Sequence, residues 1–196
     1  MKTLALFDFD GTITSKDTLL EFGKFSVGNR SFYLKMVFFV PLFFLMKIGV
    51  ISNQRGKELF LFWFIGRPEK KQFETLCKNF AEAEIPKMIR EGALEKIEGY
   101  LTDGAKVIIV SASPENWIKP WAHKHNIEVL STKLNFSENH FQGIEGTNCN
   151  GEEKVRRIEE AVDLSSFEKV IAYGDTTGDH PMLALAHEKH YKPFRE

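Results

Sequence analysis

The sequence has few cysteines and almost no net charge. Only Cys77 and Cys149 occur among 196 residues, and they form no CxxC pair. We therefore expect no disulfide framework, and a reducing cytoplasm is the simplest setting. The formal net charge is −1, so electrostatics gives no reason to expect nucleic-acid binding. The N-terminus also lacks the secretory pattern of basic residues, apolar stretch and small-residue cleavage site.

The sequence also lacks an uninterrupted apolar run of membrane-spanning length. The longest candidate, MVFFVPLFFLM at residues 36–46, is broken by Pro41 and stopped by Lys47. A spanning helix needs about 20 apolar residues, so this run is too short. Ten of the 18 phenylalanines nevertheless lie between Phe22 and Phe64. A buried helix pair or an aromatic-lined lid is the favoured interpretation, and a surface that meets lipid or a hydrophobic substrate is the alternative.

Short apolar runs alternate with helical patterns along the chain. Strands are expected at residues 4–7, 107–110, 127–130 and 170–173, a hairpin at 132–136 and 141–145, and an edge strand at 190–192. This alternation predicts an α/β fold with a mostly parallel sheet covered on both faces. Residues 17–86 are expected to be helical, with breaks near Gly28, Pro41, 49–53 and 66–68. This insertion would lie above the carboxyl ends of the strands, where such sheets bind ligands.

The segment DFDGTIT follows the first expected strand, at residues 8–14. Side chains alternate in an extended chain, so Asp8 and Asp10 should share one side while Phe9 points into the protein. Two adjacent carboxylates repel each other. They persist together when a metal ion or a nearby cation compensates their charge, or when one is protonated. Gly11 permits a sharp turn and a close approach of backbone amides to an anion.

Three later segments also place polar side chains where an expected strand ends or an expected helix begins. Ser111 follows the second strand in VIIVSAS, and Lys154 begins a helix in NGEEKVRRI. Asp175 follows the fourth strand in AYGDTTGDHPM, with Asp179 four residues later. Each signal alone also fits ordinary structure, such as a solvated lysine or an acidic turn. Their common position at strand ends predicts that one rim of the sheet carries Asp8, Asp10, Ser111, Lys154 and Asp175.

Together these segments resemble the haloacid dehalogenase-like superfamily, and more narrowly its phosphoserine-phosphatase-like subgroup. DFDGT, an apolar run ending in serine, GEEK and GDTTGD occur in the family order, and the resemblance covers nearly the whole chain. It implies a Rossmann-like, mostly parallel sheet core with an inserted all-helical cap between the first two motifs. We expect residues 1–15 and 90–196 to form the α/β catalytic core and residues 16–89 the helical cap.

The resemblance implies a magnesium-dependent phosphatase that hydrolyses a phosphomonoester through an aspartyl-phosphate. It makes Asp8 the nucleophile and a Mg²⁺ ligand, and Asp10 the general acid/base, whose backbone carbonyl also binds the metal. An acid at position 10 favours phosphoester hydrolysis, because dehalogenases of the superfamily lack it. The other implied roles are phosphoryl binding by Ser111 and Lys154, metal binding by Asp175, and orientation of Lys154 or a metal-bound water by Asp179.

Substrate choice would belong to the cap, where the sequence departs from phosphoserine phosphatase. A glutamate in the first cap turn of that enzyme is matched by Asp17 here. The cap arginine that holds a substrate carboxylate has only two loose counterparts, Arg55 and Lys57. The stretch Phe32–Ile51 is far more apolar than a serine-sized substrate requires. Phosphoserine is therefore a poor fit.

Three functions remain open. The leading one is a cytoplasmic phosphatase for a small phosphorylated metabolite, with histidinol phosphate as one family precedent. The second is a peripheral membrane phosphatase that acts on a phospholipid head group such as phosphatidylglycerophosphate, with the cap contacting the membrane. The third is a non-catalytic protein that binds a phosphorylated ligand. It is disfavoured because no expected polar site residue is missing.

Overall fold

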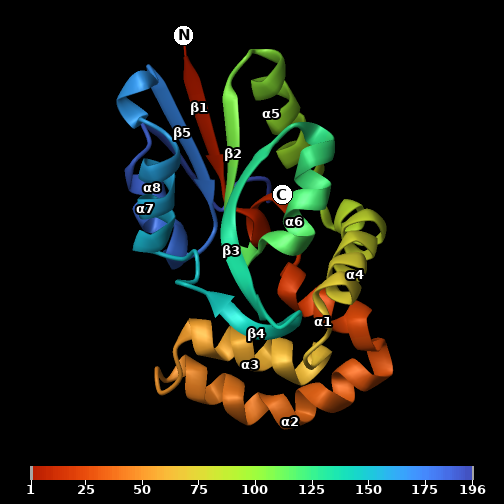
Figure 1. The fold of residues 1–196 in the computed structure, drawn as a ribbon. Coiled ribbons are helices and arrows are strands. Elements are labelled where there is room, and N and C mark those ends of the chain that lie inside the picture. Colours follow the sequence, from red (N-terminus) through yellow and green to blue (C-terminus); the bar gives the residue numbers. More distant parts are fainter. Residues whose placement is uncertain (1, 196) are drawn as a thin grey trace.

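The computed structural model describes residues 2–195, with the backbone alone for Lys47. One sheet contains six strands in the order β4-β3-β2-β1-β5-β6 (Figure 1). The strands are β1 (Thr3–Phe7), β2 (Lys106–Pro114), β3 (Glu128–Ser137), β4 (His140–Glu145), β5 (Lys169–Gly174) and β6 (Glu188–Tyr191). β3 and β4 are antiparallel, and every other neighbouring pair is parallel. The predicted α/β class with a mostly parallel sheet is confirmed.

Helices cover both faces of this sheet and form a separate group at one end. They are α1 (Thr18–Val27), α2 (Asn29–Lys47), α3 (Asn53–Ile65), α4 (Lys70–Ala83), α5 (Glu91–Thr102), α6 (Glu115–Ala122), α7 (Glu152–Ala161) and α8 (His180–Ala184). α5 and α6 lie on one face of the sheet, and α7 and α8 lie on the other (Figure 1).

The alternation of side chains along the strands explains this two-sided core. In β1, Ala5 and Phe7 belong to the apolar cluster under α5 and α6, whereas Leu4 and Leu6 belong to the cluster under α7 and α8. A strand buried on both faces must be apolar at every position. This requirement accounts for the continuous apolar runs in the sequence. It also leaves the loops at the carboxyl ends as the place for polar chemistry.

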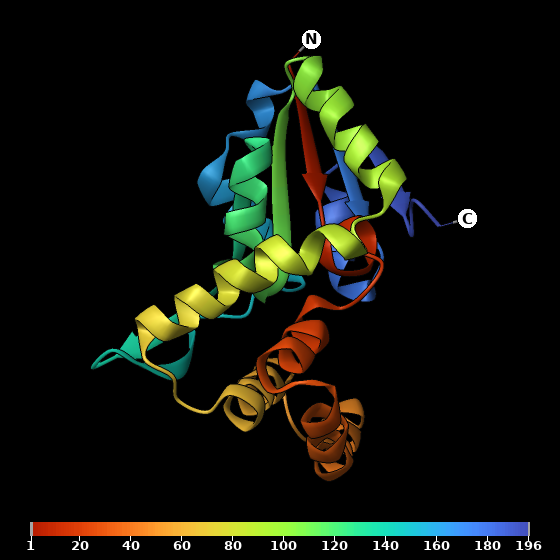
Figure 2. The same cartoon turned by 90° about the vertical axis from the view of Figure 1, so that its right-hand side faces the viewer.

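Helices α1, α2 and α3 lie beyond the carboxyl ends of the strands (Figure 2). They have a small aromatic core of their own, formed by Phe32, Phe39, Phe60 and Phe64. α4, which was expected within the cap, packs against α6 and leads back towards α5. The division into a core of residues 1–15 and 90–196 and a cap of residues 16–89 stays a prediction.

α2 continues through Pro41, where the sequence predicted a break. Proline lacks an amide donor, and this weakens a helix locally. Packing holds the helix together here: the ring of Phe39 lies 5.5 Å from that of Phe60 and 6.2 Å from that of Phe64. The tertiary contacts thus override the local preference for a break.

The length and exposure of α2 bear on two expectations. The expectation of a run too short to span concerned residues 36–46, whereas over Asn29–Met46 α2 is long and apolar enough to cross a membrane by length and composition alone. Only 11% of that stretch is buried. Most of α2 is therefore not part of a buried helix pair, and the aromatic-lined lid stays a prediction.

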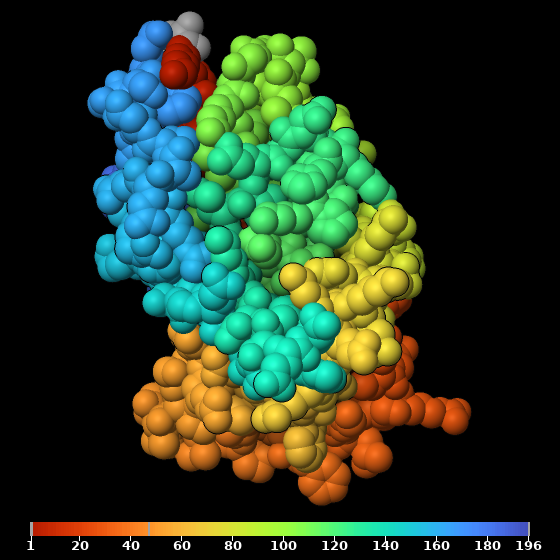
Figure 3. Space-filling model, in the orientation of Figure 1, coloured from red at the N-terminus to blue at the C-terminus, as the bar shows by residue number. Residues whose placement is uncertain are grey.

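The hairpin of β3 and β4 joins the core to the helices beyond it. The third expected strand and the first arm of the expected hairpin form one continuous strand, β3. The tip of the hairpin meets α4, where the amide of Lys70 donates to the carbonyl of Asn139 over 2.7 Å. Its other arm meets α3, where Glu58 accepts from the amide of Ile144 at 3.1 Å. Figure 3 shows this hairpin against both helices.

Candidate active site

The DFDG turn positions the first acidic residues of the site. β1 ends at Phe7, and the amide of Asp8 still donates to the carbonyl of Tyr173 in β5 over 2.9 Å. Gly11 then adopts a φ of +78°, which favours glycine. A Cβ at this position would collide with the carboxylate of Asp175. The turn therefore brings the end of β1 directly against the acidic loop after β5.

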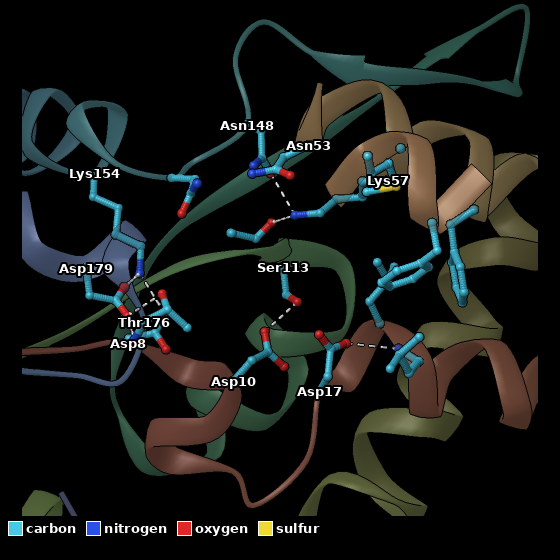
Figure 4. Close-up of a pocket in the computed structure, with 18 of the residues that line it drawn as sticks. Asp8, Asp10, Asp17, Asn53, Lys57, Ser113, Asn148, Lys154, Thr176 and Asp179 are labelled. Carbon is cyan, nitrogen blue, oxygen red and sulfur yellow. Dashed lines mark hydrogen bonds and ion pairs between the residues drawn. The ribbon is translucent and has the colours of Figure 1, made fainter. Parts of the chain in front are cut away.

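Lys154 lies at the centre of a buried charged cluster (Figure 4). Its side chain is 1% exposed, and its Nζ donates to Asp8 Oδ1 and Asp179 Oδ1, each at 2.6 Å. A third bond, of 2.7 Å, goes to the carbonyl of Val110 in the middle of β2. An ammonium group has three donors, so this environment satisfies all of them. The structure thus brings Lys154 to Asp8 and Asp179, which lie far away in the sequence.

Burial and charge set the protonation of this cluster. Burial raises the pKa of Asp8 to about 7, although the charge of Lys154 opposes the shift. Burial alone would lower the pKa of Lys154, but the charges of Asp8 and Asp179 outweigh burial and raise that pKa. Lys154 is therefore a fixed positive charge near neutral pH. Asp8 needs additional positive charge nearby to be fully ionised at neutral pH.

Asp179 has both carboxylate oxygens engaged. Oδ1 accepts from Lys154, and Oδ2 accepts from the amides of Asp175 and Thr176 at 3.1 and 2.9 Å and from Thr176 Oγ1 at 2.9 Å. Burial alone would raise the pKa of Asp179, but Lys154 and the hydrogen bonds from Thr176 lower it. This carboxylate consequently fixes the position of Lys154 and the shape of the acidic loop.

A metal ion fits beside Asp8 and Asp175. One carboxylate oxygen from each of Asp8, Asp175 and Asp179 lies within 4.8 Å of the others. Asp175 Oδ1 is buried without a hydrogen-bond partner, and Oδ2 accepts from Arg195 at 2.6 Å. Burial and the charge of Asp179 raise the pKa of Asp175. A buried, unpartnered carboxylate oxygen beside other acids is the environment that a hard divalent cation stabilises.

Asp10 connects the DFDG turn to α1 and β2. Its Oδ1 accepts from the amide of Thr18 at the start of α1, and its Oδ2 accepts from Ser113 Oγ at the end of β2, both over 2.6 Å. Thr18 Oγ1 in turn accepts from Trp117 Nε1 at 3.1 Å. These bonds hold the Asp10 carboxylate on the cavity side of the helical turn Phe9–Ile13.

Ser113 is a site residue that the sequence analysis missed. It lines the cavity and contacts Asp10, whereas Ser111 is fully buried and its hydroxyl accepts from the amide of Ser113 at 3.0 Å. Ser111 is absent from the residues that line the cavity. Its predicted contact with a phosphoryl group stays a prediction. The second serine of SAS, which also follows the apolar run, was the available signal.

Of the two cations that the sequence offered on α3, Lys57 lines the cavity and Arg55 does not. Arg55 has 59% of its side chain exposed, pairs with Glu58 and does not line the cavity, so its predicted role in substrate binding stays a prediction without support from this geometry. Lys57 lines the cavity and donates to Asn148 Oδ1 at 2.7 Å and to the carbonyl of Ala112. Burial lowers the pKa of Lys57 to about 8, against the opposing charge of Asp10 and Asp17.

Asp17 lines the same cavity from the start of α1. Its Oδ1 accepts from the amide of Leu20 at 3.0 Å and so caps the helix. Burial and the charge of Asp10 raise its pKa to about 6. The cap therefore contributes both an acid and a base, Asp17 and Lys57, to the wall opposite Asp8 (Figure 4).

The cavity has a polar floor and an apolar wall. Its volume is about 290 Å³, at the lower end of the range for ligand sites. The floor carries Asp8, Asp10 and Lys154, and helices α1, α2 and α3 contribute most of the apolar wall, namely Leu19, Leu20, Phe39, Phe43, Met46 and Phe60. Such a cavity fits a ligand with a small charged group at the floor and an apolar group beside the wall.

The fold and this constellation define a class of enzyme. The family model of the haloacid dehalogenase-like hydrolases matches residues 5–184. The chain therefore belongs to this family, as its motifs predicted. The apo form of a phosphoserine phosphatase superposes with a TM-score of 0.67 over 97% of this chain and 86% of that one, at 17% identity, and shares the fold. The family and the acid–lysine site make the chain a phosphoric monoester hydrolase.

Two curated relatives match over almost the whole chain. Protein CicA of Caulobacter vibrioides is 35% identical over 98% of this chain and 86% of its own length. A probable phosphatase of Mycobacterium tuberculosis is 28% identical over 99% of this chain and 70% of its own length.

Proposed function

We propose that the chain is a magnesium-dependent phosphatase that hydrolyses a phosphomonoester through an aspartyl-phosphate on Asp8. The observation that carries this proposal is the position of Lys154, whose Nζ lies 2.6 Å from both Asp8 and Asp179. A buried ammonium beside a carboxylate gives that carboxylate a partner for the negative oxygens of a phosphoryl group. Asp8 lies on the cavity floor, where it can reach such a group.

Asp8 and Asp10 divide the reaction into two displacements. In the first, an Asp8 oxygen bonds to phosphorus, the ester P–O bond breaks, and Asp10 gives its proton to the leaving oxygen. In the second, water attacks phosphorus, Asp10 takes a proton from that water, and the bond between Asp8 and phosphorus breaks. Phosphate leaves and both carboxyl groups return to their starting state. Ser113 and Thr18 keep Asp10 oriented towards the leaving oxygen.

The proposed magnesium site uses the carboxylates of Asp8 and Asp175 and the backbone carbonyl of Asp10. The buried, unpartnered Oδ1 of Asp175 supports this assignment. Bound Mg²⁺ would neutralise negative charge on the phosphoryl oxygens and on Asp8. Asp179 has no free oxygen to offer, so its proposed role is to orient Lys154. We retain Ser111 as a proposed phosphoryl contact.

The proposed substrate is a small phosphorylated metabolite in the cytoplasm. Two buried free thiols, Cys77 and Cys149, are compatible with a reducing compartment. The second candidate is a phosphate on a lipid head group, and the apolar wall of Phe39, Phe43 and Met46 favours it. The cavity of about 290 Å³ holds a phosphorylated head group but not acyl chains, so such a substrate must leave its tail outside.

Hydrolysis of p-nitrophenyl phosphate with and without Mg²⁺ tests the proposed chemistry. Asp8→Asn should lower turnover by at least about 10⁴-fold, because an amide cannot form the aspartyl-phosphate. Asp103→Asn is the matched control, since Asp103 is an exposed aspartate at the end of α5. Substantial turnover by Asp8→Asn, or full activity in a chelator, would contradict the covalent or the magnesium part respectively.

A further inference from the structure

Six large apolar side chains project outward along α2. Each is between 58% and 68% exposed. They form what we call the outer face of α2: Tyr33, Leu34, Val37, Phe38, Val40 and Phe44. Soluble chains seldom leave a contiguous apolar surface of this kind without a partner. The folded core does not explain it, because α2 packs on α3 through the opposite stripe that contains Phe32 and Phe39.

The sequence around this face lacks acidic residues. Residues 22–57 contain no Asp or Glu, although the chain has 27 acidic residues, and they contain six Lys or Arg residues. Lys24 and Arg55 pair with acids outside this stretch, and Lys57 lines the cavity. Arg30, at the start of α2, is exposed. An exposed apolar helix face with Arg30 beside it and no acidic residue on the helix matches the surface of a bilayer that contains anionic lipid. A second copy of the same face would bring like charges together.

We propose that the outer face of α2 docks the protein onto an anionic lipid bilayer, with the helix lying flat in the interface. The flat orientation follows from the ties between α2 and α3. Lys35 Nζ donates to the carbonyl of Trp63 at 3.0 Å, and Trp63 Nε1 donates to the carbonyl of Lys35 at 3.2 Å. A spanning orientation would break these bonds and would move Lys35 into hydrocarbon. Trp63 is 47% exposed, and tryptophan favours the membrane–water boundary.

The docked face lies on the side of α2 away from the cavity. Phe43, which is 46% exposed, lines the cavity next to Phe39 and is not part of the outer face. Docking does not depend on the proposed chemistry, because it uses side chains outside the acid–lysine cluster. If the phosphatase is correct, docking holds it at a surface that carries lipid phosphate esters.

Vesicle flotation tests the docking. The wild-type chain should float with vesicles of phosphatidylcholine that contain about one quarter phosphatidylglycerol, and added salt should weaken this binding. Phe38→Ser with Phe44→Ser should weaken binding at least about tenfold, since two aromatic side chains no longer enter the interface. Arg30→Glu should weaken it as well. Lys78→Glu, an exposed lysine on α4, is the matched charge control and should float like the wild type.

Several results would overturn the docking. The first is failure of the wild type to float, and the second is unchanged flotation of the double phenylalanine variant. The third is a wild-type dimer in sedimentation velocity that dissociates in this variant while vesicle binding is unaffected. The variants at Phe38 and Phe44, Arg30 and Lys78 should keep wild-type turnover of p-nitrophenyl phosphate, which shows that they fold. Asp8→Asn should float like the wild type. An inactive protein that floats would contradict only the proposed chemistry, and an active protein that does not float would contradict only the docking.

Discussion

Lys154→Met should destabilise the protein strongly, and more strongly at high pH than at low pH. Methionine keeps most of the length of the side chain but removes its charge and its three donors. Asp8 is 6% and Asp179 is 1% exposed, and each loses a charged partner at 2.6 Å. The carbonyl of Val110 also loses its donor at 2.7 Å.

The magnitude follows from these losses. Removing one partner of a buried ion pair costs about 3–5 kcal/mol, because the remaining charge stays buried without compensation. The cost can be relieved if a carboxylate takes up a proton. Asp8 has a native pKa of about 7 against an ordinary value of 3.8, and loss of Lys154 raises the native pKa further. At a pH between the ordinary pKa of Asp8 and its raised native pKa, the native state binds more protons than the unfolded state. Lowering the pH therefore stabilises the variant.

Urea unfolding in a chelator, followed by circular dichroism, measures this effect. We expect Lys154→Met to lose about 3–5 kcal/mol at pH 8 and clearly less at pH 6. Lys87→Met is the matched control: Lys87 is 66% exposed and pairs with Glu84 at 2.9 Å, and its loss should cost under about 0.5 kcal/mol. A cost below about 1 kcal/mol for Lys154→Met at pH 8, or one that does not shrink at pH 6, would refute the reasoning.

Two further predictions concern the metal and the cap. Mg²⁺ at about 100 times its Kd should stabilise the wild type by about 2.7 kcal/mol, and Asp175→Asn should lose this gain in thermal unfolding with and without Mg²⁺. Equal gains in both proteins would exclude Asp175 as a ligand. Lys57 loses its charge as the pH rises through about 8, so the KM for an anionic substrate should rise above that pH. Lys57→Gln should have a raised KM with no such rise in its pH profile, whereas Arg55→Gln should behave like the wild type. A wild-type profile in Lys57→Gln would contradict its role.

The sequence contained enough information for the sheet and for the chemical identity of its rim. Strands buried on both faces show themselves as continuous apolar runs, and residues 4–7 are such a run. The sequence predicted Asp8 and Asp10 on one side, and both line the cavity, although Phe9–Ile13 forms a helical turn and not the extended chain that the prediction assumed. The order of the motifs led to the family before any contact was visible. These inferences succeed because local periodicity records which side of an element is buried.

Tertiary structure decided the partners of these residues. Asp10 is bound by Ser113 and Thr18, and Lys57 rather than Arg55 faces the cavity, because the approach of α1 and α3 to the end of β2 selects them. α2 continues through Pro41 because packing on α3 outweighs a local preference. Periodicity tells which way a side chain points from its own element. Only the packing of distant elements determines what lies opposite it.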